Sequence, residues 1–323
     1  MRMYTSTLRI HPRVSGGPGA GPRRGVGQGP TILILIFKES EMLKVVGLFG
    51  VGLAVMGCAF SLPFRVRFER VAFGGLPSCL RGMKILHITD LHGRRPDRMH
   101  RDIWPNLLDL DFDMAVLTGD VILDDVRQLR PYMDSLKFLA EKAPVFYVEG
   151  NHEQGYHVEM ARILESIGVT VLYNRRGNFA VGNAGRARSA MVSVAGFRDY
   201  DHLLEHDFDG VRPMLDDMAK SGKFHIVLSH QPQIFDLLGN YVRKYKPGRS
   251  FSALVLAGHT HGGQVRLPFM PTLYAPGQGV LPKYGDGWYY NGGLKLFVSR
   301  GVGATHFPLR VFNPPEAALI ELE

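Results

Sequence analysis

At 323 residues the chain is long enough for one large domain with a full core, and its composition is that of an ordinary globular protein. Its two cysteines, Cys58 and Cys79, exclude a disulfide framework and a zinc–thiolate site. The net charge is +8, but residues 1–44 hold seven Lys or Arg and two Glu, so they carry +5 and the rest only +3. We therefore expect no nucleic-acid partner, which would need basic residues clustered on a folded face.

The first residues show no pattern of a folded domain. Residues 1–30 are rich in Gly, Pro and Arg without periodicity. Met42, which precedes a long apolar run, resembles a genuine start. We therefore expect 1–41 to be disordered or an extension that is absent from the native protein. Arg23-Arg24 is a poor twin-arginine signal, because no apolar run follows it closely.

A transmembrane anchor or signal segment is expected at 42–63. Val45–Leu62 is eighteen residues without a charge, enough for a tilted membrane span and also typical of the apolar part of a signal peptide. Its four glycines fit a membrane helix better than the alternative, a buried core helix. Cys58 in this run is a poor lipoprotein acceptor.

The charges around this run bear on its orientation. The basic residues that follow it outnumber Lys44 before it. If Met42 is the start, the positive-inside rule favours a catalytic domain that faces the cytoplasm. The alternative is a cleaved segment and a secreted or periplasmic protein.

We expect a linker or entry segment at 64–82 and one continuous domain at 83–323, where apolar strand patterns alternate with helical ones. Strands that end in polar residues are expected at Met83–His92, Met114–Asp120, Val145–His152, Phe224–His230 and Leu254–His261. Further strands are expected at Val169–Tyr173, Asn178–Val181, Met191–Ala195, Leu294–Ser299 and Ala317–Glu321. Helices are expected at Asp125–Glu141, Tyr156–Ile167, Val211–Lys220 and Gln233–Leu238.

The polar ends of five strands carry metal-binding side chains. Asp90 and His92 are spaced i, i+2, so both side chains can point the same way at the carboxyl end of a strand, where open α/β sheets bind their ligands. The full set is Asp90, His92, Asp120, Asn151, His152, His230, His259 and His261. Imidazoles and oxygen ligands without a thiolate suit Mn²⁺, Fe or Zn²⁺. The set is too large for one ion, but two ions about 3.5–4 Å apart that share a carboxylate would use it.

These segments resemble the calcineurin-like metallophosphoesterase superfamily over residues 83–323. The motifs are Asp90-Leu91-His92, Gly119-Asp120, Gly150-Asn151-His152-Glu153, Leu228-Ser229-His230 and Gly258-His259-Thr260-His261. The resemblance implies an α/β fold, a four-layer α/β/β/α sandwich with two mixed β-sheets. The extended Gly258–Gln264 and the tail Ser299–Gly303 are similar to a bacterial, often membrane-anchored branch with phosphodiesterases and UDP-2,3-diacylglucosamine pyrophosphatases. The acidic Asp124-Asp125 after the Gly-Asp element argues against a Ser/Thr protein phosphatase.

The resemblance also implies a role for each residue. Asp90, His92 and His261 would hold the first metal ion. Asn151, His230 and His259 would hold the second. Asp120 would bridge the two, and His152 would act as general acid or stabilise phosphoryl charge. His152 could instead be structural or a further ligand.

The expected function is hydrolysis of a phosphodiester or pyrophosphate bond with two divalent metal ions, Mn most readily and Fe or Zn otherwise. A nucleotide-linked lipid such as UDP-2,3-diacylglucosamine is the leading substrate, and the chain is expected to be a monomer. The alternatives are a general phosphodiesterase of the cell envelope and a non-catalytic metal-binding interaction module. The aromatic stretch Phe269–Tyr290 is expected to be a loop packed on its own aromatic rings, or else part of an acyl-chain groove. Gly301-Val302-Gly303 is expected to be a simple turn rather than a phosphate-binding element.

Overall fold

The computed structural model describes residues 63–93, 99–182, 190–204, 208–245, 251–264, 266, 270–303 and 310–323. The expected extension at 1–41, and the expected anchor at 42–63 except for its last residue, lie outside the described residues. None of the helices in the described part of the chain has the length and apolar composition that a membrane crossing requires.

The first sheet has six strands in the described residues. Its order is β1 (Arg65–Val71), β14 (Glu316–Leu322), β2 (Lys84–Ile88), β3 (Met114–Thr118), β4 (Val145–Val148) and β5 (Val169–Val171). Only the β14–β2 pairing is antiparallel. Strands β2, β3 and β4 are apolar along their length because this sheet is covered on both faces.

The second sheet also has six strands among the described residues. Its order is β12 (Gly287–Asn291), β13 (Leu294–Val298), β9 (Ser252–Ala257), β8 (Phe224–Leu228), β7 (Ala190–Gly196) and β6 (Arg175–Val181). The two edge strands β12 and β6 pair antiparallel, and the four central strands run parallel. A separate hairpin joins β10 (Tyr274–Ala275) to β11 (Gly279–Val280).

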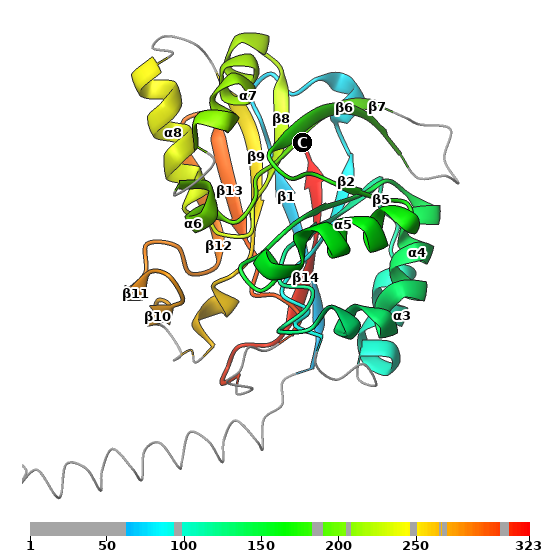
Figure 1. The fold of residues 1–323 in the computed structure, drawn as a ribbon. Coiled ribbons are helices and arrows are strands. Elements are labelled where there is room, and N and C mark those ends of the chain that lie inside the picture. Colours follow the sequence, from blue (N-terminus) through cyan, green and yellow to red (C-terminus); the bar gives the residue numbers. More distant parts are fainter. Residues whose placement is uncertain are drawn as a thin grey trace, which may run out of the picture. The chain divides into compact units, whose positions relative to one another are not determined.

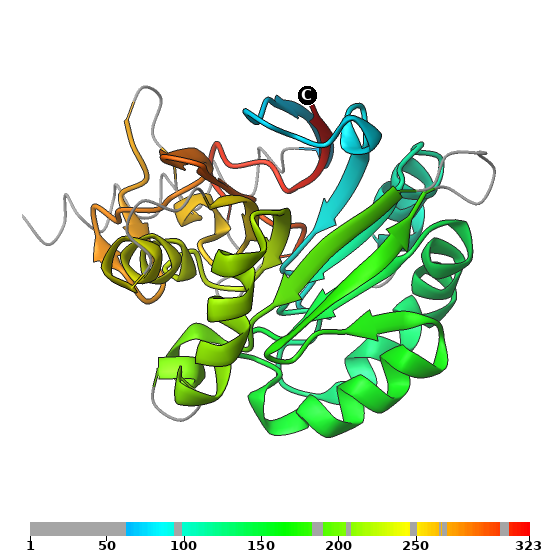
Figure 2. The ribbon, with the colours of Figure 1, turned by 90° about the horizontal axis from the view of Figure 1, so that it is seen from above.

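Helices cover the outer faces of both sheets, as the two views show (Figure 1 and Figure 2). The first sheet packs on α3 (Trp104–Leu108), α4 (Met133–Lys142) and α5 (His157–Ser166), and the second on α7 (Phe208–Ser221) and α8 (Ile234–Tyr245). A third cluster, with Ile85, Phe146 and Leu254 among its members, fills the space between the sheets. The expected four-layer α/β/β/α sandwich with two mixed sheets is confirmed.

Short helical segments fill several connections. They are η1 (Ser78–Leu80), the π-helical η2 (Met99–Ile103), η3 (Val126–Tyr132), η4 (Gln154–Tyr156), α6 (Tyr200–His202) and η6 (His261–Gly263).

Four expectations from the sequence need correction. The stretch Phe269–Tyr290, expected to be a loop, contains the β10–β11 hairpin and most of β12. The helix expected at Asp125–Glu141 is in fact η3 followed by α4, with Pro131 inside the 3₁₀ part, because a proline ring does not fit the interior of an α-helix. The helix expected at Gln233–Leu238 continues to Tyr245. Residues 64–82, expected as an entry segment, contribute β1, which pairs along its whole length with β14.

Candidate metal centre

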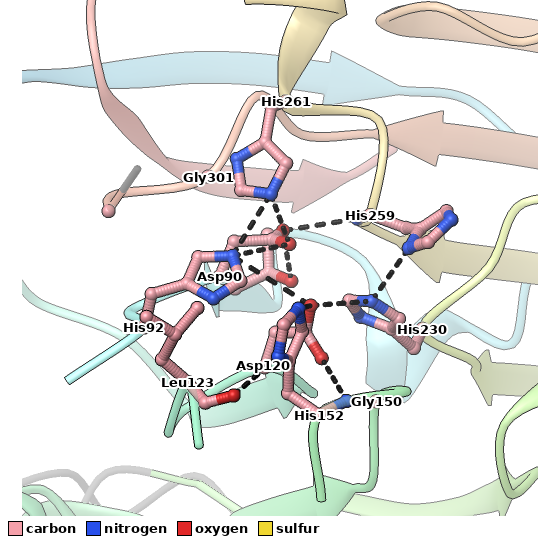
Figure 3. Close-up of polar contacts among 12 residues, drawn as sticks. Asp90, His92, Asp120, Leu123, Gly150, His152, His230, His259, His261 and Gly301 are labelled. Atoms are coloured by element: carbon pink, nitrogen blue, oxygen red, sulfur yellow. Dashed lines mark hydrogen bonds and ion pairs between the residues drawn. The ribbon is translucent and has the colours of Figure 1, made fainter. Parts of the chain in front are cut away.

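The eight predicted site residues all follow the carboxyl ends of strands, and the seven other than Asn151 lie together (Figure 3). Asp90 and His92 follow β2, Asp120 follows β3, Asn151 and His152 follow β4, His230 follows β8, and His259 and His261 follow β9. The carboxyl ends of these parallel strands meet at one edge of the two sheets, which is where α/β folds place their ligands.

Five of these residues have a left-handed backbone. Their φ angles lie between 50° and 69°, and they are Asp90, His92, Asp120, His259 and His261. Asp and His are enriched among the few non-glycine residues that adopt this conformation, which costs roughly 1–2 kcal/mol each. Strained backbone of this kind gathers at functional sites, where the surrounding fold maintains it.

The first cluster consists of Asp90, His92 and His261, all buried. His92 Nε2 lies 3.0 Å from His261 Nε2. His261 Nε2 lies 3.2 Å from Asp90 Oδ1, and His92 Nε2 lies 3.8 Å from the same oxygen. Three ligand atoms therefore converge on one point, which we call the first subsite.

The second cluster consists of Asp120, His230 and His259, and Asp120 also groups with His92 of the first cluster and with His152. Asp120 Oδ2 lies 3.2 Å from His230 Nε2 and 3.8 Å from His92 Nε2. His259 Nδ1 lies 3.1 Å from His230 Nε2. We call Asp120, His230 and His259 the second subsite, to which the sequence interpretation adds Asn151; Asp120 is the residue that faces both subsites.

The chemistry of these donor atoms fits divalent cations. Asp90 Oδ1 and Asn151 Oδ1 are buried and have no hydrogen-bond partner among the described residues. Buried polar atoms without a partner are costly, and a bound cation would satisfy them. Carboxylate, amide oxygen and imidazole ligands without thiolate suit Mn²⁺, Fe or Zn²⁺.

Protonation differs between the two subsites. Burial lowers the pKa of His92 to about 3 and that of His261 well below its ordinary value, so both imidazoles are neutral, as metal ligands must be. Burial also raises the pKa of Asp90 to about 6. In the second subsite burial acts to lower the pKa of His230, but the charge of Asp120 outweighs it and raises that pKa to about 10.

The pKa of Asp120 is shifted in the opposite direction to that of His230. Burial acts to raise the pKa of the Asp120 carboxyl, but the charge of His230 and its hydrogen bond hold that pKa well below the ordinary value. The two residues therefore form a buried ion pair at the centre of the site.

His152 lies at the open side of the centre, with its side chain 20% exposed. Its Nδ1 hydrogen-bonds the carbonyl oxygen of Leu123, which fixes Nδ1 as the donor. Its Nε2 lies 3.8 Å from Asp120 Oδ2 and faces the site. The geometry thus presents one nitrogen of His152 to a bound substrate.

Glu153 is a site residue that the sequence interpretation did not assign. It is buried, and its two carboxylate oxygens accept hydrogen bonds from the backbone N–H groups of Asp120 (2.9 Å), Gly150 (2.7 Å) and Ile122 (3.0 Å). Burial and the charge of Asp120 raise its pKa to about 8. The sequence feature that could have identified Glu153 is its place directly after Asn151-His152. Its role is to hold the loops after β3 and β4 together.

Glycine is required where these loops touch. A Cβ atom on Gly150 would lie 2.2 Å from Asp120 Oδ1, and one on Gly258 would lie 2.4 Å from Asp90 Oδ2. No side chain fits at either position, so the strand ends approach one another only through glycine.

Residues near the end of the chain also support the site. Asn313 Nδ2 donates to the carbonyl oxygen of His261 at 2.6 Å, and Arg310 Nη2 lies 3.3 Å from His261 Nδ1. Gly301 and Gly303 pack on Asp90, with the N–H of Gly303 donating to the carbonyl oxygen of Asp90 at 2.6 Å. The turn Gly301–Gly303 therefore supports Asp90. Sequence spacing gave no signal for the roles of Asn313 and Arg310.

Comparison with known proteins agrees with this geometry. A family model described as calcineurin-like phosphoesterase matches residues 83–263, more than half of the chain. An uncharacterized metallophosphoesterase of Helicobacter pylori is 28% identical over 249 residues, covering 74% of this chain and 60% of the relative. The alignment therefore leaves more than a third of that relative's length unmatched.

Two further relatives carry names that bear on function or location. The phosphodiesterase YaeI of Escherichia coli is 28% identical over 246 residues, covering 74% of this chain and 82% of the relative. A Bos taurus transmembrane protein with metallophosphoesterase domain is 25% identical over 304 residues, covering 91% of this chain and 62% of the relative.

Proposed function

Because the chain belongs to the calcineurin-like phosphoesterase family, its domain is a metallophosphoesterase that hydrolyses phosphoester bonds, and we propose that the whole protein is a two-metal phosphodiesterase or pyrophosphatase. The observation that carries this proposal is the shared position of Asp120. Its carboxylate faces two clusters of buried ligands at once, as a residue that bridges two ions must.

Each subsite has its own ligands in this proposal. Asp90, His92 and His261 hold one ion, Asn151, His230 and His259 hold the other, and Asp120 contacts both. Two bound divalent ions lower the pKa of water to make a nucleophile and offset the charge of phosphoryl oxygens. Mn²⁺ is the proposed metal, and Fe and Zn²⁺ suit the same ligands.

His152 supplies the proton in this mechanism. With Nδ1 hydrogen-bonded to Leu123, its protonated form presents Nε2–H toward the substrate. As the phosphorus–oxygen bond breaks, the leaving-group oxygen takes that proton and departs as an alcohol or a phosphate. His152 also orients phosphoryl oxygens, because phosphoryl transfer depends mainly on positioning and charge stabilisation.

The ligand set argues against a non-catalytic binding module. A scaffold that kept the fold without catalysis would tolerate the loss of ligands or of the acid. In this chain every expected ligand position has a residue that can bind a metal, and His152 is present. Glu153 holds two of the loops in place.

Lipid-linked substrates are the finer part of the proposal. The uncharged run Val45–Leu62 would hold the domain at a membrane, and a relative from Bos taurus is named as a transmembrane protein. A nucleotide-linked lipid such as UDP-2,3-diacylglucosamine is one such substrate, and a general phosphodiester of the cell envelope is the second candidate. The name of the YaeI relative favours the diester.

Attachment and orientation are proposed on sequence grounds. A single N-terminal segment anchors a monomer, and the catalytic domain faces the cytoplasm, with a secreted or periplasmic form as the alternative. The basic residues after the run, such as Arg65 and Arg67, favour the first orientation. We also propose that the protein is a member of a bacterial, membrane-anchored branch of the family.

Hydrolysis by the full chain in mild detergent with Mn²⁺ tests the function. The substrates are bis-p-nitrophenyl phosphate and UDP-2,3-diacylglucosamine, each with a chelator control, and Asp120→Asn serves as the inactive control. Chelator-sensitive release of UMP far above the diester rate would support the lipid pyrophosphate. Turnover of the diester alone would support the phosphodiesterase, and activity on neither with metal bound would favour the binding module.

A further inference from the structure

A group of exposed apolar side chains lies beside the metal centre. Val280 is 78% exposed, Leu281 66%, Tyr274 56% and Phe312 42%. Tyr274 and Val280 are direct partners in the β10–β11 hairpin, so their side chains point to one face of it. We call these four residues the apolar rim. Clustered large apolar side chains in solvent mark interaction surfaces.

The rim is attached to the loop that carries His259 and His261. A Cβ atom on Gly263 would lie 2.7 Å from the carbonyl oxygen of Tyr274, so the hairpin rests against this loop. A Cβ atom on Gly277, at the hairpin turn, would lie 3.3 Å from His259 Nε2. Phe312 adjoins Asn313, which bonds the carbonyl oxygen of His261. The rim therefore flanks the metal centre.

The chain also enters the domain at this edge. The N–H of Arg65, the first residue of β1, donates to the carbonyl oxygen of Pro315, and the Arg65 guanidinium pairs with Glu316 at 3.1 Å. The N–H of Glu316 donates to Gly301, which packs on Asp90. In Figure 1 the β10–β11 hairpin lies toward the end of the sheets where β1 and β14 begin.

The sequence before this entry point is the uncharged run that ends at Leu62, three residues before Arg65. A membrane-inserted run would hold the start of β1, and with it the metal centre, next to the bilayer. The hairpin segment 270–283 suits that position because it contains no Asp or Glu, and its one basic residue, Lys283, pairs with Asp236 at 2.6 Å. Exposed aromatic and aliphatic side chains are typical of interfacial membrane binding.

We propose that the apolar rim inserts into the interface of a lipid bilayer and turns the metal centre toward the membrane surface. The inference rests on the proposed membrane attachment, and it narrows the substrate to a phosphoester carried by a membrane lipid at headgroup level. In this proposal the apolar rim contacts the bilayer, and the apolar run Val45–Leu62 anchors the domain to it.

A fluorescent label on the rim of the full chain tests the proposal. In a Cys58→Ala, Cys79→Ser background, the label is placed at Val280→Cys and, as a second rim position, at Leu281→Cys. The matched control is Met191→Cys, which is 60% exposed at the amino end of β7, the opposite end of the sheet from the metal centre. The labelled chains are reconstituted into vesicles of phosphatidylcholine and phosphatidylglycerol, some of them with nitroxide-labelled lipid.

The expected result is a blue shift and strong nitroxide quenching at positions 280 and 281, with neither at position 191. Vesicle flotation is measured on the same samples. A chain that floats without quenching at the rim overturns the inference and leaves anchoring intact, whereas a chain that does not float overturns both. A blue shift that grows with protein density without lipid quenching assigns the rim to a second copy. Hydrolysis of bis-p-nitrophenyl phosphate is assayed separately, so a failure of the proposed chemistry is distinct from a failure of rim insertion.

Discussion

The two subsites share Asp120 but differ in charge and in proton content. The first adds the carboxylate of Asp90 to two imidazoles whose pKa values are depressed by burial. The second would have the neutral amide of Asn151 in place of a second carboxylate, and the charge of Asp120 raises the pKa of His230 to about 10. A cation entering the first subsite meets neutral imidazoles and a second carboxylate. A cation entering the second must displace the proton of His230.

The backbone differs in the same direction. All three unshared residues of the first subsite have positive φ, whereas only His259 does so in the second. The first subsite therefore contains more strained backbone than the second. From this difference we predict that the two subsites bind an ion with unequal affinity and that the first subsite fills first.

Loss of the shared ligand should have the largest effect. Asp120→Asn removes the charge that both subsites use, so both ions should be lost. Turnover should fall by more than about 100-fold, since even the loss of a residue that only hydrogen-bonds a metal ligand can cost that much. Metal content per chain and diester hydrolysis measure this. Asp113→Asn, at a buried carboxylate that accepts the N–H of Lys84, is the matched control. Two ions retained in Asp120→Asn would refute the bridge.

The next test separates His152 from both subsites. His152→Ala should keep both ions and slow hydrolysis of substrates with poor leaving groups by about 10²–10⁴-fold, the contribution of a general acid. Substrates with a p-nitrophenyl leaving group should be affected little. His157→Ala, five residues further along, is the control. Equal losses for all leaving groups would remove the acid role, and loss of one ion would make His152 a ligand.

Substitutions that change the charge of one ligand test the difference between the two subsites. Asp90→Asn should weaken one ion of the two by at least about 10–100-fold, because the first subsite then carries the same charge as the second. Asn151→Asp should tighten the other ion. Chelator titrations with metal analysis give the stoichiometry at each step. Simultaneous loss of both ions in Asp90→Asn would show that the subsites do not fill independently.

Glu153 positions loops of both subsites, so its substitution should have a smaller and shared effect. Glu153→Gln replaces an acceptor oxygen with an NH₂ group that cannot accept the N–H bonds it faces. We expect about 1–3 kcal/mol lower free energy of unfolding. Metal affinity should fall about 10–100-fold. Chemical denaturation and metal titration report the two quantities, and Glu159→Gln on α5 is the control.

Lowering the pH tests the contribution of the buried His87 to stability. Burial lowers the pKa of His87 to about 3, below its ordinary value of 6.5. The unfolded chain therefore takes up this proton first, and stability present above pH 6.5 is lost as the pH falls toward 3, by up to about 1.4 kcal/mol per pH unit. Unfolding of the chelator-treated protein at several pH values should show a shallower slope in His87→Leu. An unchanged slope would exclude His87 as the source.

The sequence by itself determined the central strands and the positions of the candidate ligands after them, and the family resemblance implied the layers. Strand patterns at Met114–Thr118 and Val145–Val148 are local, since an apolar β-branched run encodes its own conformation. The polar residues that follow these strands must meet, because the carboxyl ends of neighbouring parallel strands lie at one edge. All eight predicted site residues follow such strand ends for this reason, and seven of them lie together in Figure 3.

Only the tertiary structure decided what depends on distant contacts. Strand β1 forms because it pairs with β14, whose residues lie 251 positions away in sequence, and no local pattern encodes that partner. The same holds for Glu153 as the acceptor of three backbone N–H groups and for Asn313 beside His261. The position of the apolar rim beside the metal centre is likewise a result of packing, because side chains far apart in sequence become one surface only once the sheets are assembled.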